Sequence, residues 1–117
     1  ELGRVEMHDL VIRGGTIVDG TYVLEKWEKY VGTEDAPKPS VQARRDMIVF
    51  AGGTAEFVVD FPGVVFKTYS LTYTVSGGEL LVQQTCPNQT ESSPAFEATE
   101  TTFKWLNGKE LTYFKKI

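Results

Sequence analysis

Few residues in this chain could carry out acid–base or nucleophilic chemistry. The single histidine, His8, is followed by Asp9, but we expect both in a strand over residues 5–12, where neighbouring side chains point to opposite faces. The two residues therefore cannot easily form a proton relay. The single cysteine, Cys86, precedes Pro87 at a loop or strand end, far in sequence from the histidine that would have to activate it. We interpret Cys86 as structural or incidental and assign no catalytic residue.

The same scarcity argues against a metal or other cofactor. With one His and one Cys, a zinc or iron site would need mostly carboxylate ligands, and no carboxylate cluster occurs at ligand spacing. A lone cysteine also excludes an internal disulfide. We predict no metal and no cofactor.

Charge and hydropathy narrow the range of partners. Sixteen acidic residues against twelve basic ones give a formal net charge of −4, and the lysines are scattered, so nucleic acid is not expected as a partner. No apolar run approaches the roughly 20 residues that a membrane span needs. Because the chain begins with Glu1 and not Met, we expect a processed or trimmed chain. The sequence leaves the oligomeric state open.

The elements that must position any site are β-strands. A chain of 117 residues has room for one domain, and 12% aromatic residues favour a pleated sheet. Residues 55–61 and 65–75 alternate apolar side chains with polar ones, which is typical of strands with one face on a core. Glycines at 77–78 and the pair Asn107-Gly108 indicate hairpin turns. We expect further strands over 47–50, 80–84, 96–98, 102–106 and 111–117, loops over 32–40 and 85–94, and no helix. The 32–40 loop is a candidate lid.

The longest predicted strand, Asp19 to Val31, changes the phase of its apolar residues part-way, which indicates a bulge or a bend. If its even-numbered face is interior, Lys26 and Glu28 lie near a barrel mouth and could fix a polar group of a ligand. The alternative is that both charges are solvated.

Several short motifs carry a resemblance to a known family. Gly20-Thr21-Tyr22 resembles the Gly-x-Trp opening of lipocalins, with Tyr in place of Trp, and residues 73–80 and 96–105 resemble paired strands of small bacterial lipocalin-like domains. Residues 15–24 together with Thr85-Cys86-Pro87 are similar to exported bacterial proteins of that kind. The resemblance covers about residues 14–117, and we predict a single calycin-type domain over residues 1–117. The resemblance implies an antiparallel up-and-down β-barrel of about seven or eight strands and a secreted or cell-envelope location. It implies no reaction.

Such a barrel can be filled by side chains or can hold a small molecule, and both interpretations stay open. We predict three kinds of function: non-catalytic binding of a small apolar or amphipathic ligand, a small β-barrel enzyme of cyclase or isomerase type, and an interaction module with a filled core. The predicted ligand-binding residues are those of the long strand and those of the expected inward faces: Tyr22, Leu24, Lys26, Glu28, Tyr30, Phe57, Val59, Tyr69, Leu71, Tyr73, Phe103, Trp105 and Tyr113.

Overall fold

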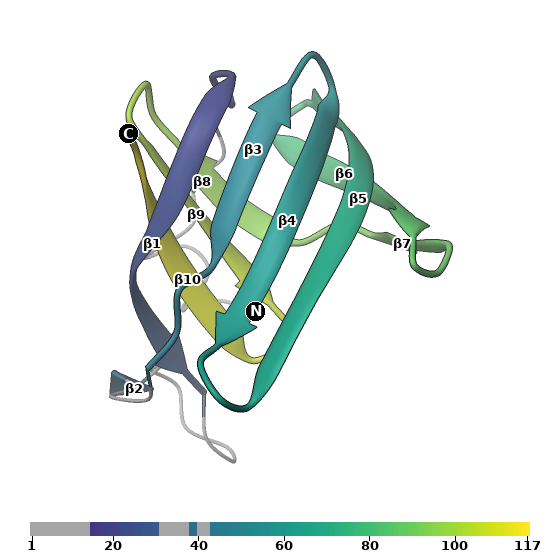
Figure 1. Ribbon diagram of the computed structural model, residues 1–117. Coiled ribbons are helices and arrows are strands. Elements are labelled where there is room, and N and C mark those ends of the chain that lie inside the picture. Colours follow the sequence, from purple (N-terminus) through teal and green to yellow (C-terminus); the bar gives the residue numbers. More distant parts are fainter. Residues whose placement is uncertain (1–14, 31–37, 40–42) are drawn as a thin grey trace.

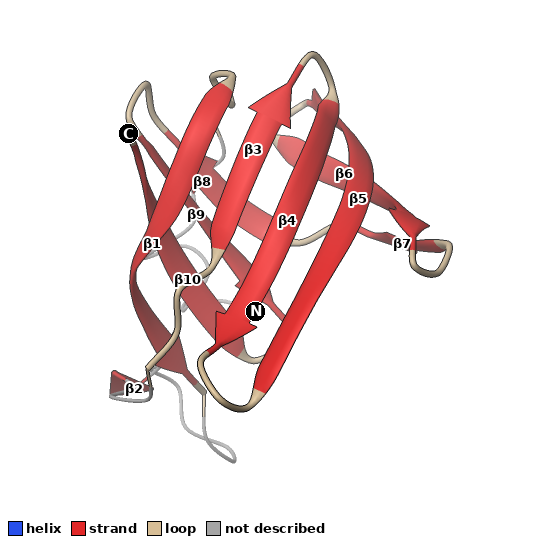
Figure 2. Cartoon of the chain, in the orientation of Figure 1, coloured by secondary structure: helices blue, strands red, loops and turns tan. Residues whose placement is uncertain are grey.

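The computed structural model describes residues 15–30, 38–39 and 43–117, and these residues form antiparallel strands joined by turns, with no helix among them (Figure 2). This confirms the all-β antiparallel prediction. The predicted strand at 5–12, including His8, and most of the predicted lid loop lie outside the described residues. The strands are β1 (Gly20–Lys29), β2 (Lys38–Pro39), β3 (Met47–Ala51), β4 (Thr54–Phe61), β5 (Val65–Ser76), β6 (Glu79–Cys86), β7 (Thr90–Ser92), β8 (Ala95–Ala98), β9 (Thr102–Asn107) and β10 (Glu110–Lys116).

All ten described strands belong to one sheet, in the order β7-β6-β5-β4-β3-β1-β10-β9-β8, with β2 paired to β1 beside this path. β1 lies between β3 and β10, so the sheet joins the early and late parts of the chain. The sheet curls strongly into a half-barrel (Figure 1). Each strand can thus direct alternate side chains toward one shared interior.

The two ends of the sheet are linked by the segment 90–98. Its first part, β7, pairs with β6, and its second part, β8, pairs with β9 at the opposite end of the sheet. Between them, the Ser93 hydroxyl donates a hydrogen bond of 2.8 Å to the carbonyl oxygen of Leu80. The prediction of a loop over 85–94 is therefore wrong for the end of β6 and for β7, and the strand count exceeds the predicted seven or eight.

The long strand β1 contains the predicted irregularity. Its register against β10 shifts between Leu24 and Lys26. Before the shift, Tyr22 is buried in the core, and after it the buried residue is Trp27, which belongs to the other phase. The bulge reverses the faces of the strand: even-numbered residues face the interior before it, and odd-numbered residues face the interior after it.

The core is largely aromatic and lies at one end of the half-barrel. The Phe50 ring packs edge-to-face against Tyr22, Tyr73 and Phe103, with centroid distances of 5.5, 5.3 and 5.0 Å. Such edge-to-face contacts add to the free energy gained from burying the rings. The buried cluster consists of Tyr22, Ile48, Phe50, Ala55, Phe57, Leu71, Leu80, Val82, Phe96, Ala98, Phe103, Trp105 and Phe114.

Candidate functional site

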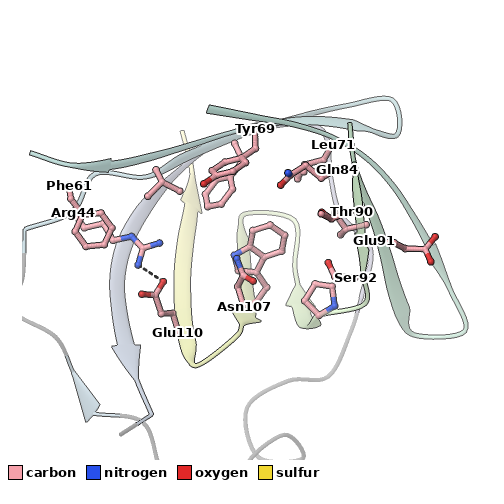
Figure 3. Close-up of a pocket in the computed structure, with 15 residues that line it drawn as sticks. Arg44, Phe61, Tyr69, Leu71, Gln84, Thr90, Glu91, Ser92, Asn107 and Glu110 are labelled. Carbon is pink, nitrogen blue, oxygen red and sulfur yellow. Dashed lines mark hydrogen bonds and ion pairs between the residues drawn. The ribbon is translucent and has the colours of Figure 1, made fainter. Parts of the chain in front are cut away.

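The half-barrel is filled at one end and hollow at the other. A cavity of about 500 Å³ lies at the hollow end, between β4, β5 and β6 on one side and β9 and β10 on the other (Figure 3). It is lined by Arg44, Phe57, Val59, Phe61, Tyr69, Leu71, Val82, Gln84, Thr90, Glu91, Ser92, Pro94, Trp105, Asn107 and Glu110. The sequence left open whether the barrel is filled or hollow. In the structure, side chains fill one end, and the other end contains the cavity.

Strand alternation explains why one chain makes both parts. Along β9, Phe103 fills the core, Trp105 lies at the boundary and lines the cavity, and Asn107 continues the cavity wall. On β6, Leu80 is in the core, and Gln84 reaches the cavity. On these two strands every second residue faces the interior, and the inward residues change from apolar to polar toward the open end.

The apolar wall of the cavity is built from rings that support one another. Phe57 packs edge-to-face against Trp105 at 5.5 Å and lies at a tilt against Tyr69 at 5.8 Å. Because Phe57 and Trp105 are also part of the buried cluster, the wall is anchored in the core. Such a surface is already in place before any ligand binds, and no ordering of these rings would oppose binding.

A buried ionic cluster forms another part of the wall. The Arg44 guanidinium contacts Asp46 Oδ2 through Nε at 2.7 Å and Nη2 at 2.6 Å, and its Nη1 donates to Glu110 Oε1 at 2.9 Å. Arg44 Cζ also lies 4.8 Å from the ring centroids of both Trp27 and Phe61. The Arg44 side chain is 5% exposed and that of Asp46 is fully buried. Burial opposes the charge of Arg44, but the two carboxylates outweigh it and raise the pKa of the guanidinium.

Asp46 is held by the backbone as well as by Arg44. Its Oδ1 accepts a hydrogen bond of 3.1 Å from the amide of Asp60, and its carbonyl accepts one of 3.0 Å from the amide of Leu24. The carboxylate therefore ties β4 to the segment that precedes β3, and fixes the position of Arg44 at the cavity wall. A buried charge is tolerated where such partners satisfy it.

Comparison with known proteins bears on the fold. No family model and no curated protein matches the sequence. A solved structure described as a lipocalin-like protein from Bacteroides uniformis superposes with a TM-score of 0.60, covering 85% of this chain and 97% of that chain at 12% identity. The fold of this chain is lipocalin-like. The resemblance stated from the short sequence motifs is confirmed at the level of the fold, since an identity this low shows the fold alone.

Within this lipocalin-like fold, five of the predicted ligand-binding residues come together around the cavity. They are Phe57, Val59, Tyr69, Leu71 and Trp105. Their role in binding stays a prediction. The signal that located four of them was the alternation of apolar and polar residues in β4 and β5, because it assigns each residue to a face.

Other predicted residues belong to the filled end. Phe103 and Tyr22 are buried in the core cluster, and the Tyr22 hydroxyl donates to the carbonyl of Val18. Leu24 and Tyr73 are partly buried and pack against the same cluster. These residues support the cavity and do not line it.

The remaining predictions on β1 and β10 meet outside the cavity. Tyr113 follows inward-facing Thr112 and precedes core residue Phe114, so alternation places its ring on the outer face, and the expected inward orientation of Tyr113 is wrong. There its hydroxyl donates to Glu28 Oε1 at 2.8 Å, and Lys26 Nζ lies 4.4 Å from its ring centroid. Burial, and then the hydrogen bond to Glu28, raise the pKa of Tyr113. Beyond the bulge the even-numbered residues of β1 turn outward, so for Lys26 and Glu28 the structure agrees with the alternative in which both charges lie outside the interior.

Tyr30, just past the end of β1, is buried but does not line the cavity. Burial raises the pKa of its hydroxyl, with a smaller contribution from Glu28. Tyr30 is thus a buried side chain near Glu28, outside the cavity to which the sequence assigned it.

The most consequential residues that sequence reasoning missed are Arg44 and Glu110. They lie 66 positions apart, and no local pattern connects them.

Cys86 is exposed. Within the described ranges, no group of three or more His, Cys, Asp or Glu side chains could hold a metal ion. In the same part of the chain, no helix is long and apolar enough to cross a membrane.

Proposed function

We propose that this protein binds a small amphipathic molecule, without catalysis, in the cavity at the hollow end of its half-barrel. The observation that carries the proposal is the cavity itself. Its 500 Å³ fall within the range of about 300–1,000 Å³ that is usual for ligand sites. At ~30 Å³ for each water in the liquid, this space equals about 17 water molecules, which suits a compact organic ligand.

The composition of the wall supports an amphipathic occupant. Phe57, Leu71 and Trp105 offer apolar contact, while Gln84, Asn107 and Glu110 offer hydrogen-bonding groups. An apolar surface with a few polar groups is typical of sites that orient a ligand as well as bury it. The lipocalin-like fold is consistent with this use of the interior.

The proposal is tested with a neutral fluorescent probe, N-phenyl-1-naphthylamine, whose emission rises in apolar surroundings. We expect saturable binding to the protein and its loss in Val59→Trp, because Val59 lines the cavity and the larger ring takes up part of its volume. The control is Val49→Trp, the same substitution at an exposed position on β3. Both variants are checked by circular dichroism and thermal unfolding.

Two results would contradict the proposal: no saturable probe binding to the wild-type protein, or equal binding by the folded Val59→Trp and Val49→Trp variants. Should Val59→Trp not fold, Gln84→Trp blocks the cavity from β6 and serves the same comparison.

A further inference from the structure

We propose that the ligand is a cation: a small organic ammonium whose charged group lies beside Glu110 and whose apolar part lies against the rings of the cavity. The inference rests on the proposed function, because it assigns a chemistry to the same cavity. It begins from the charges around that space.

The cavity wall has an excess of negative charge. Among its lining residues, Arg44 has the one formal positive charge, and Glu110 has the negative charge beside it. The Glu91 carboxylate points away from the cavity (Figure 3) and accepts from Gln83. Asp46, fully buried against Arg44, adds a second carboxylate at the guanidinium, so these three side chains together are net negative. A site with this balance attracts cations and repels anions, and the effect is strong where water is partly excluded.

Arg44 is poorly placed to bind an anionic ligand. Its guanidinium is engaged by Asp46 and Glu110, and its side chain is 5% exposed. An anion that approached its remaining N–H groups would also lie near the Glu110 carboxylate, which the ion pair fixes in place at 2.9 Å. An anion at this wall would therefore meet the charge of Glu110 as well as that of Arg44.

Glu110 is the group best placed to meet a cation. Its side chain is 33% exposed and lines the cavity, and Oε1 accepts from Arg44. In Figure 3, Glu110 and Arg44 are joined at one side of the cavity, and Asn107 lies next to the open space with its amide oxygen as a further acceptor. An ammonium group needs such acceptors and supplies donors only.

The aromatic wall fits the same class of ligand. Tyr69 lies at the cavity wall in Figure 3. Its ring packs at a tilt against Phe57, and Phe57 packs edge-to-face against Trp105. Ring faces attract cations, and aromatic enclosures are a recurring means of recognising organic ammonium groups. The rings can also bury an attached hydrocarbon part. One wall thus serves both portions of an amphipathic cation.

The test compares three ligands that share one apolar part: 4-phenylbutylamine, 4-phenylbutan-1-ol and 4-phenylbutanoate. Isothermal titration calorimetry on the full chain at pH 7 gives their dissociation constants. We expect the amine to bind about tenfold more tightly than the alcohol, and the carboxylate to bind more weakly than both; tenfold corresponds to ~1.4 kcal/mol. The advantage of the amine should shrink at high ionic strength.

A matched pair of variants assigns the preference to Glu110. Glu110→Gln keeps an oxygen that can accept from Arg44 but removes the charge, and should lower amine affinity about tenfold while leaving alcohol affinity unchanged. Glu97→Gln is the control, because Glu97 is 32% exposed and forms an ion pair of 2.9 Å with Lys104, away from the cavity lining. It should leave the affinities for all three ligands unchanged.

The outcomes separate this inference from the proposed function. If the alcohol or the carboxylate binds as tightly as the amine and Val59→Trp abolishes that binding, the cation assignment is overturned and the cavity proposal stands. Equal amine affinity in Glu110→Gln and Glu97→Gln also overturns it. If neither the fluorescent probe nor any of the three ligands binds, both proposals fail. Where Glu110→Gln does not fold, the order of the three ligands and its salt dependence in the wild-type protein decide.

Discussion

Replacement of Asp46 should be among the most damaging single changes in this protein, even though the residue is small and polar. In Asp46→Asn, the Arg44 guanidinium loses its main counter-charge while it stays buried. Removing one partner of a buried ion pair typically costs about 3–5 kcal/mol, because the other charge is left uncompensated. Glu110 offsets part of this loss, so we expect a cost of about 3 kcal/mol in the free energy of unfolding.

The next residue along the chain from Arg44 supplies the control. Arg45 forms an ion pair of 3.2 Å with Asp60, but its side chain is 73% exposed. Exposed pairs contribute about 0–1 kcal/mol, since water screens them and side-chain entropy opposes them. Arg45→Ala should therefore cost less than about 1 kcal/mol. Asp46→Asn and Arg45→Ala therefore compare the loss of a buried ion pair with the loss of an exposed one, within three consecutive residues.

The assay is urea unfolding followed by tryptophan fluorescence and circular dichroism, with free energies extrapolated to water. A second variant checks the cause: Arg44→Met in the Asp46→Asn background removes the uncompensated charge and should recover part of the loss. The reasoning is refuted if Asp46→Asn costs no more than Arg45→Ala, or if the added Arg44→Met lowers stability further.

Other predictions concern the core, the outer face and a turn. Phe50→Ala should lower the free energy of unfolding by about 3–5 kcal/mol in urea unfolding, because it empties the centre of the aromatic core. Phe66→Ala, at an exposed site, should change it by no more than about 0.5 kcal/mol. Similar costs for the two variants would contradict the packing described. The pKa of Tyr113 is raised above its ordinary 10.0, so the unfolded chain loses this proton first and stability falls as pH rises above about 10. Tyr113→Phe should make that fall shallower, and an unchanged slope would contradict a pKa raised by burial and by the hydrogen bond to Glu28. Gly108→Ala should cost about 1 kcal/mol, since φ is +65° there, and a stabilised variant would refute this.

The parts of the fold that could be predicted are those encoded by local pattern. β4 and β5 alternate strictly, so their faces were assigned correctly and Phe57, Val59 and Tyr69 fell into one group. The phase change in β1 predicted its bulge, and Asn107-Gly108 predicted the last hairpin. In each case a few neighbouring residues decide the backbone geometry.

What could not be predicted depends on contacts between distant segments. β7 is polar and has no strand pattern of its own, and it forms because β6 offers it a partner at the end of the sheet. Arg44 and Asp46 looked like ordinary charges before a strand, and only the strand order, which places β1 between β3 and β10, brings Glu110 to Arg44. Tyr113 was misassigned because β10 has apolar side chains in both phases, Leu111 and Tyr113 in one and Phe114 in the other, which hides the period of the strand.

The most direct test of a ligand-accessible cavity is a heteronuclear NMR titration of the ¹⁵N-labelled protein with 4-phenylbutylamine. The chain has two tryptophans, and their indole N–H signals report on two places: Trp105 lines the cavity, whereas Trp27 packs against Arg44 and Phe61 and does not. A saturable shift of the Trp105 signal that exceeds the shift of Trp27, and that is lost in Val59→Trp, is the predicted result. An unmoved Trp105 signal at ligand concentrations that saturate other resonances would contradict the account.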